Sequence, residues 1–303
     1  MHPAPSLIFF TVLSGLGLGL IISLGFGFGP QDQGFALVAC FLALAITGGG
    51  GSLSVLHLAN PKNAWRAFSQ WRSSWLSREA CLMVATMGLF ALYAAIWVFS
   101  GYRLWGLGLL AATLALSTVY ATAMIYAQIK AVPTWSFTPT PALFLTLSIV
   151  GGIITCRLLQ GIFGDTGEAW HVLPAIAVAA GVSIWWTTQA AGAGRTATGS
   201  SIASATGLGR QGQVRLFEGP HTGRNYLLDE MAYRIGRKRA FELRRIGAYV
   251  GFLIPLALAV IALFTSSWLL LAVLVCHIAG VMALRWLFFA EAEHVQALYY
   301  GQE

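Results

Sequence analysis

The stretch Ser54–Met83 reads SVLHLANPKNAWRAFSQWRSSWLSREACLM and separates two long apolar runs. It gathers a histidine, four cations, three tryptophans and an acid, namely His57, Lys62, Arg66, Arg72, Arg78, Trp65, Trp71, Trp75 and Glu79. The rest of the first half of the chain has almost no charge. Polar groups are costly to place at the end of a membrane helix, so their concentration here indicates a functional site.

The composition of the 303-residue chain is typical of an integral membrane protein. It is 57% hydrophobic and 10% charged, whereas a soluble domain carries about 25% charged residues. A membrane helix needs about 20 mainly apolar residues. Eight such runs lie near 7–29, 35–58, 79–100, 104–127, 140–161, 170–191, 246–266 and 268–290. They lack the alternation of barrel strands. We therefore expect an all-α bundle of eight transmembrane helices in a single domain, 1–303.

Two groups of features restrict the processing and the metal content of this protein. The first run has no basic n-region and no small-residue cleavage site, so we expect a retained helix rather than a signal peptide. The four cysteines, Cys40, Cys81, Cys156 and Cys276, are far apart in apolar runs and form no CxxC pair. Iron–sulfur clusters and structural zinc sites need grouped thiolates. We therefore expect no iron–sulfur cluster and no metal site in this chain.

The basic residues are distributed unequally between the two sides that eight crossings would produce. One side receives both termini and the segments 59–78, 128–139 and 192–245. It holds 16 of the 18 Lys and Arg residues when Arg285 is counted with the C-terminal tail, and the other side holds Arg103 and Arg157. Lys and Arg accumulate on the cytoplasmic side. We therefore expect both termini in the cytoplasm, with the protein in the inner membrane of a bacterium, although a basic docking face would give a similar bias.

The long segment 192–245 has two parts. Residues 192–225 are rich in Gly, Ala, Ser and Thr and indicate a flexible surface excursion. From Tyr226 onward, apolar and charged residues interleave and predict a basic amphipathic helix leading into the seventh run. Such a helix would bind anionic lipid headgroups or dock a soluble subunit. The docking candidates are Arg72, Arg78, Arg234, Arg237, Lys238 and Arg239. Membrane orientation explains the basic charge, and no motif indicates nucleic-acid binding.

His57 and Glu79 have the chemistry that a site would need. His57 lies just before Asn60-Pro61, where proline ends the second helix, and its imidazole can donate a hydrogen bond near neutral pH. Glu79 follows Ser77, which can cap the third helix, and an acid in the first turn suits the helix dipole. An interfacial histidine and a dipole-matched acid are sufficient explanations for each alone. Together with the Trp and Arg rim, they also supply a donor to a quinone oxygen, a proton-passing carboxylate and an amphipathic entrance.

Two rival interpretations are weaker. A haem b would need axial histidines within the bilayer, but His171 lies at the opposite end from His57, and nothing supports pairing His57 with His277. A transporter would need charged or broken-helix sites near the membrane midplane, where these runs have almost no charge. Tight packing or a local kink explains the interruption Gly48–Gly51. Co-purification would discriminate, because an anchor brings partner polypeptides and a transporter is isolated alone.

Short motifs on the basic side carry a family resemblance. They are His57-Leu58-Ala59-Asn60-Pro61, Ala67-Phe68, Leu76-Ser77-Arg78-Glu79, and Val132-Pro133-Thr134-Trp135 with Thr138-Pro139. They resemble the HLG-x-P, R-A-F and L-S-x-E patterns, and a second signature, of the membrane anchor subunit of dimethyl sulfoxide reductases, the DmsC family. Ala59 and Asn60 depart from the commoner Gly-Ser. The eight-run count agrees, and the segments from Thr222 to Met231 and from Glu291 to Gly301 are similar to the longer proteobacterial branch.

The resemblance implies an anchor that exchanges electrons between the quinone pool, ubiquinone or menaquinone, and an iron–sulfur subunit with four clusters. That subunit would serve a molybdopterin catalytic subunit, so this chain would be the quinone-binding part of an oxidoreductase complex. The quinol site of the family maps to His57 and its important acid to Glu79, with Arg66 and Trp135 as further candidates. The family anchor carries no haem.

The expected orientation separates two kinds of complex. Exported dimethyl sulfoxide reductases place their soluble subunits outside, whereas the corresponding loop is expected inside here. This is similar to the anchor of the cytoplasm-facing sulfite dehydrogenase, in which sulfite is oxidised and quinone is reduced. A dimethyl sulfoxide reductase-like complex that faces inward and oxidises quinol is the alternative.

Overall fold

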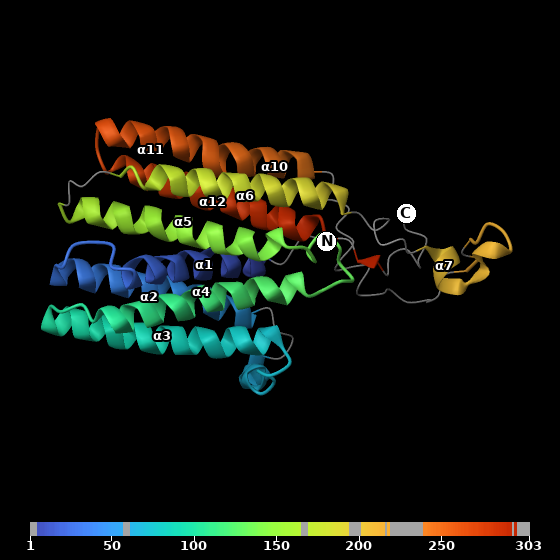
Figure 1. Ribbon diagram of the computed structural model, residues 1–303, viewed down its shortest axis with the longest axis horizontal. Helices are drawn as coiled ribbons and strands as arrows, with labels where there is room; N and C mark the ends of the chain where they lie inside the picture. The colour runs from blue at the N-terminus through green and yellow to red at the C-terminus, as the bar shows by residue number, and fades with distance from the viewer. Residues whose placement is uncertain are drawn as a thin grey trace.

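The computed structural model describes residues 5–56, 61–164, 169–193, 201–215, 217–218, 239–292 and 294–295. These residues form a bundle of long helices and contain no strand (Figure 1). Eight membrane-crossing helices occur in the described ranges. They are α1 (Pro5–Gly25), α2 (Gln33–Leu56), α3 (Trp75–Ser100), α4 (Trp105–Ala127), α5 (Pro139–Ile162), α6 (Val172–Gly192), the series α10 (Ala240–Ala248), η4 (Tyr249–Leu253) and α11 (Ile254–Phe264), and α12 (Leu269–Ala290). The expected all-α membrane fold is confirmed.

Three short helices lie in the connections: η1 (Pro61–Phe68), α7 (Ile202–Thr206) and η3 (Leu208–Arg210). The seventh crossing begins at Ala240, earlier than the expected residue 246, so Arg244 and Arg245 belong to the helix itself. Most of the expected amphipathic helix, residues 226–238, lies outside the described residues. The structure therefore extends the seventh helix but leaves the preceding basic segment as a prediction.

The two ends of the bundle differ in charge. The start of α1, the end of α12 and the α2–α3, α4–α5 and α6–α10 connections lie together at one end, on the right in Figure 1. We call this the basic end, because its described cations are Lys62, Arg66, Arg72, Arg78, Lys130, Arg210, Arg215, Arg239, Arg244 and Arg245. Arg103 and Arg157 lie at the opposite end. Arg285 does not belong to the tail, because it lies inside α12, about 7 Å before its last residue at 1.5 Å per residue.

The helix α1 occupies the centre of the bundle and contacts α2, α4, α5 and α12. Small residues let membrane helices approach closely. A Cβ added to Gly19 would stand 1.8 Å from the carbonyl oxygen of Ser148 on α5. The helix α2 runs unbroken through Gly48–Gly51, and a Cβ on Gly50 would stand 2.4 Å from the backbone nitrogen of Ser14. Close packing therefore accounts for Gly50, and α2 is not interrupted there.

The contact between α1 and α5 gives a direct test of this packing. A Cβ on Gly152 would lie 2.0 Å from the backbone carbon of Gly19, which cannot move aside as a flexible side chain would. We expect Gly152→Val to lower the free energy of unfolding by more than the roughly 1–3 kcal/mol of ordinary overpacking. Thermal melting of the detergent-solubilised protein measures this. Gly181→Val on α6 is the control, because no atom lies within 4 Å of its added Cβ; equal melting temperatures would contradict the prediction.

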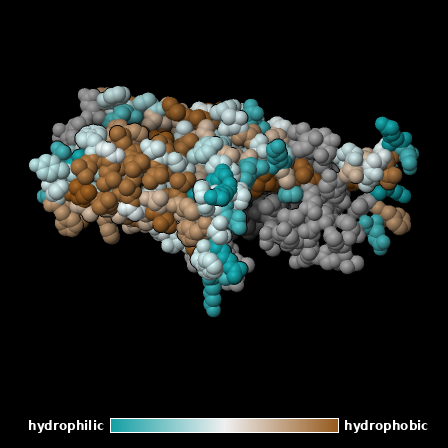
Figure 2. Space-filling view, turned by 60° about the horizontal axis from the view of Figure 1, so that its bottom comes forward, coloured by the Kyte–Doolittle hydropathy of each residue, from teal (hydrophilic) through white to brown (hydrophobic). Residues whose placement is uncertain are grey.

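The outer surface of the bundle is apolar at mid-helix positions. Phe41, Val84 and Val178 are 71%, 60% and 58% exposed. In Figure 2, hydrophobic residues cover much of the visible side of the helices, and hydrophilic residues gather on the segment that projects from it. Such a surface is suited to lipid chains rather than to water.

Candidate functional site

Glu79 lies in the second turn of α3. The helix begins at Trp75, and the hydroxyl of Ser74 caps it by accepting a hydrogen bond from the Ser77 N–H at 3.5 Å. Ser77 therefore lies within the helix, and the expectation that it caps α3 is wrong. The first turn contains no acidic residue. A dipole-matched acid in the first turn consequently does not explain Glu79.

The carboxylate of Glu79 is enclosed between α3 and α4. Its side chain is 5% exposed and accepts a hydrogen bond from the hydroxyl of Thr122 on α4. Deeper along the same interface, the hydroxyls of Thr86 and Thr118 are 3.0 Å apart. Glu79 has no ion-pair partner among the described residues. A buried acid that no cation neutralises is expensive inside a membrane protein and indicates function.

Tyr126 continues the polar groups one turn beyond Thr122 on α4. Its ring packs against Trp135, Phe144, Phe288 and Phe289, with centroids 5.3 to 5.8 Å apart. One of these rings, Phe144, also contacts the guanidinium group of Arg285 on α12. Tyr126 therefore connects the α3–α4 interface with the α5–α12 interface at the basic end.

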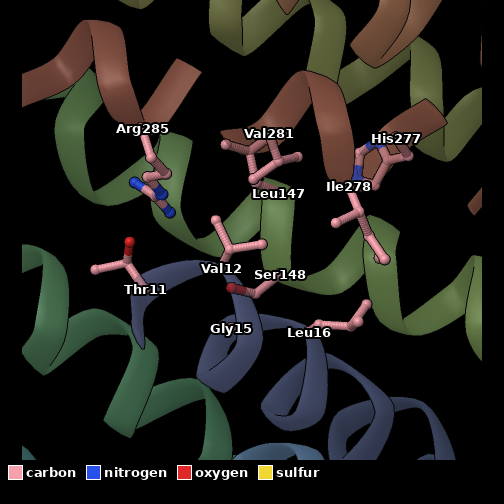
Figure 3. A pocket seen from close by; sticks show the side chains of 11 residues that line it. Thr11, Val12, Gly15, Leu16, Leu147, Ser148, His277, Ile278, Val281 and Arg285 are labelled. Carbon is pink, nitrogen blue, oxygen red and sulfur yellow. The ribbon is translucent and has the colours of Figure 1, made fainter. Parts of the chain in front are cut away.

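Arg285 is 1% exposed on α12. Its guanidinium carbon lies 3.4 Å from the ring centroid of Phe144, and its Nε and Nη1 have no hydrogen-bond partner among the described residues. The side chain borders a cavity of about 20 Å³ between α1, α5 and α12, space for about one water molecule. Figure 3 shows the guanidinium group turned toward Thr11 of α1. We call Glu79, Thr122, Tyr126 and Arg285 the buried polar row.

Trp135 supports this row from the α4–α5 connection. It is 5% exposed, its indole N–H donates to the carbonyl oxygen of Phe288 at 2.7 Å, and its ring stacks on Phe288 at 5.3 Å. The hydroxyl of Thr134 donates to the carbonyl oxygen of Glu291 at 3.2 Å. These hydrogen bonds hold the connection against the end of α12 and place Trp135 beside Tyr126.

The basic residues of the α2–α3 connection have different surroundings. Arg66 on η1 and Arg72 are exposed and lie over Trp65 and Trp71, at 5.6 and 5.5 Å from the ring centroids. Arg78 instead donates to the carbonyl oxygens of Trp71 and Arg72 at 3.0 and 2.7 Å and packs over Trp75. Arg66 and Arg72 are therefore available to a partner, whereas Arg78 holds the connection together.

Several predicted residues lie outside the described part of the chain: His57, Arg234, Arg237 and Lys238. On either side of the undescribed residues 57–60, α2 ends at Leu56 and η1 begins at Pro61, and both of these helices contact α3. Arg239 is described and exposed at the start of α10. The proximity of His57 to Glu79 stays a prediction.

The whole chain matches one protein family. A family model described as DMSO reductase anchor subunit (DmsC) matches residues 1–301. The chain belongs to the DmsC family. A sulfite dehydrogenase subunit of Allochromatium vinosum is 30% identical to it, over 99% of both sequences. A polypeptide of the anaerobic dimethyl sulfoxide reductase of Escherichia coli is 29% identical, over 57% of this sequence and 61% of that protein. No solved structure matches.

DmsC membership confirms the resemblance expected from the motifs and, with the eight apolar helices, makes this protein a membrane anchor subunit. The four cysteines of this DmsC protein are unpaired. Within the described ranges, no group of three or more His, Cys, Asp or Glu could hold a metal ion. His277 lies mid-span with its Nδ1 3.1 Å from the carbonyl oxygen of Gly251. The absence of haem and of iron–sulfur clusters from this anchor stays a prediction.

Three members of the buried polar row were missing from the sequence-based site: Thr122, Tyr126 and Arg285. A cation inside an apolar run is a signal for Arg285, although the charge count above places this residue in the tail. Thr118, Thr122 and Tyr126 recur at helical spacing, which predicts a shared helix face and does not reveal what that face contacts.

Proposed function

We propose that this protein is the quinone-reactive anchor of a molybdenum and iron–sulfur oxidoreductase that passes electrons from sulfite oxidation to the quinone pool. The observation that carries the proposal is the buried Glu79, held by Thr122 in a polar row at the basic end. Full-length similarity to a sulfite dehydrogenase subunit supports sulfite as the substrate of the complex. Similarity to a dimethyl sulfoxide reductase polypeptide over part of the sequence favours quinol oxidation as the second candidate.

The side chains at this site have the chemistry that quinone reduction needs. Quinone supplies the acceptor chemistry, because its reduction takes up two electrons and two protons. Glu79 holds a proton on its carboxyl group and passes it on, while Thr122 orients that carboxyl group through its hydrogen bond. His57 is assigned as the hydrogen-bond donor, and Arg66 as part of the rim. Trp135 positions Tyr126 by holding the connection against α12.

The basic end is proposed as the cytoplasmic end, in the inner membrane of a bacterium, because its cations follow the positive-inside rule. The exposed Arg66, Arg72 and Arg239 would attract the acidic face of an iron–sulfur subunit with four clusters. Arg234, Arg237 and Lys238 are assigned to the same docking surface. The exchange balances: sulfite takes an oxygen atom from water and becomes sulfate, which releases the two electrons and two protons that quinone reduction takes up.

Purification of the complex through a tag on this protein tests the proposal. We expect a molybdenum-containing and an iron–sulfur polypeptide to co-purify, and the complex to reduce quinone when sulfite is added. Quinol oxidation by dimethyl sulfoxide without sulfite activity would favour the second candidate. Isolation of the tagged polypeptide alone would contradict the anchor role. A reporter fused at Glu303 should read out in the cytoplasm, and a periplasmic signal would reverse the proposed orientation.

A further inference from the structure

A large groove lies between α6 and the α10–η4–α11 segment. Its volume is about 480 Å³, within the roughly 300–1,000 Å³ of small-molecule sites. The groove is lined by α6, by the seventh crossing and by Leu284 of α12, whereas Glu79 lies between α3 and α4. We propose that this groove binds one anionic phospholipid, with the phosphodiester at the basic end and an acyl chain directed toward the midplane.

The polarity of the groove changes along the helix axes. Arg244 and Arg245 line it at the basic end, and Ile176 and Leu256 line it farther in. From Arg245 to Leu256 the helix advances about 16 Å at 1.5 Å per residue. A cationic mouth followed by an apolar channel parallel to the helices matches a lipid headgroup with its acyl tail. Basic pockets between membrane helices commonly hold anionic headgroups.

The two arginines are not equivalent. Arg244 forms an ion pair with Glu291, just beyond α12, and its Nε is buried without a hydrogen-bond partner among the described residues. Arg245 is exposed, lies 5.8 Å from the ring centroid of Phe241, and has no carboxylate partner among those residues. Arg245 is therefore available to neutralise one phosphodiester, while the ion pair with Glu291 holds Arg244 at the mouth of the groove.

A hydroxyl group lies one turn deeper than the mouth. Ser183 lines the groove, is 3% exposed, and its hydroxyl has no hydrogen-bond partner in the described part of the protein. Thr187, one turn closer to the basic end, already donates to the carbonyl oxygen of Ile184 at 2.9 Å. Ester carbonyl groups of a phospholipid lie below its phosphate, so Ser183 is placed to donate to one of them. An unsatisfied buried hydroxyl is otherwise costly.

The fold keeps this groove open. Gly251 of η4 packs on Gly280 of α12, where a Cβ on Gly280 would stand 2.0 Å from the Gly251 Cα. The π-helical turn Tyr249–Leu253 is therefore held against α12, and its other side borders the groove. Turns of this kind occur preferentially at functional sites.

Native mass spectrometry of the purified complex, with phosphatidylglycerol and phosphatidylethanolamine added in equal amounts, tests the site. We expect selective binding of phosphatidylglycerol. Arg245→Gln should weaken it about fivefold, the effect of about 1 kcal/mol per basic residue at an anionic lipid surface. Lys130→Gln is the control, because Lys130 is exposed at the same end of the bundle and does not line the groove.

A second pair of variants tests the channel. Ala180→Phe should block the acyl tail and reduce bound phosphatidylglycerol, whereas Val178→Phe, on the lipid-facing side of α6, should not. Equal binding of both lipids, no effect of Arg245→Gln, or release of quinone instead of lipid by Ala180→Phe would overturn the proposal. If Ala180→Phe fails to fold, Arg245→Gln, which changes an exposed side chain, still tests the proposal. Unchanged sulfite-dependent turnover in the Arg245 variant separates this site from the proposed quinone site.

Discussion

Replacing Glu79 with Gln should lower quinone-linked turnover by about 100-fold or more, within the roughly 10²–10⁴ range of general acid–base catalysis. Glutamine keeps the size of the side chain, and its amide oxygen can still accept the hydrogen bond from Thr122. It cannot hold and release a proton. Sulfite-dependent reduction of a quinone by the intact complex measures the loss. Activity with an artificial acceptor, which takes electrons from the soluble subunits, should be unchanged and shows that the complex is assembled.

Two further variants separate proton transfer from a general charge effect. Glu242→Gln removes an exposed acid from α10 at the same end of the bundle, so it should leave quinone turnover near the wild-type rate. His57→Ala should cause a loss comparable to that of Glu79→Gln, also with intact assembly. Wild-type quinone reduction in both the Glu79 and His57 variants would exclude this site.

The fold was predictable because lipid restricts the backbone to a few solutions. Eight apolar runs of sufficient length imply eight helices, since every backbone polar group must be satisfied within the segment. The predicted start of the seventh helix, residue 246, is too late because Arg244 and Arg245 resemble interfacial residues. The ion pair of Arg244 with Glu291, 47 positions away, lets the helix begin earlier. Nothing local in the sequence reveals that partner.

The candidate site was predictable only in part, for a related reason. Glu79 is conspicuous as an acid near the start of an apolar run, but its partner Thr122 is 43 positions away. With Ser77 as the cap, Glu79 would lie in the first turn of α3 and match the helix dipole. The observed cap is Ser74, so Glu79 lies in the second turn. Arg285 and Tyr126 become relevant only when α12 packs beside α5 and α4. Helical spacing predicts which residues share a face and does not identify the neighbouring helix.

Arg285→Met should raise the melting temperature of the complex while lowering quinone-linked turnover. Arg285 is buried with an aromatic ring beneath it, yet its Nε and Nη1 have no hydrogen-bond partner among the described residues. Burial of such a cation destabilises a protein, and an apolar side chain of similar size removes that cost. The guanidinium group packs on Phe144, whose ring centroid lies 5.8 Å from that of Tyr126. Tyr126 follows Thr122 by one helical turn, and Thr122 is the hydrogen-bond partner of Glu79, the proposed proton-transfer residue. We expect turnover to fall roughly 10- to 100-fold, less than the ~10²–10³ effect of removing a donor that contacts developing charge.

Arg103 provides the matched comparison, because it also packs on an aromatic ring but is hydrogen-bonded. Its guanidinium lies 4.0 Å from the Trp97 centroid and donates to the carbonyl oxygens of Gly27 and Gly29 at 2.7 and 2.6 Å. Arg103→Met should therefore lower the melting temperature, opposite in sign to Arg285→Met. Arg285→Lys should restore part of the turnover if charge is the requirement. Thermal melting and quinone reduction on the same preparations measure both; a less stable Arg285→Met variant with normal turnover would make Arg285 a purely structural residue.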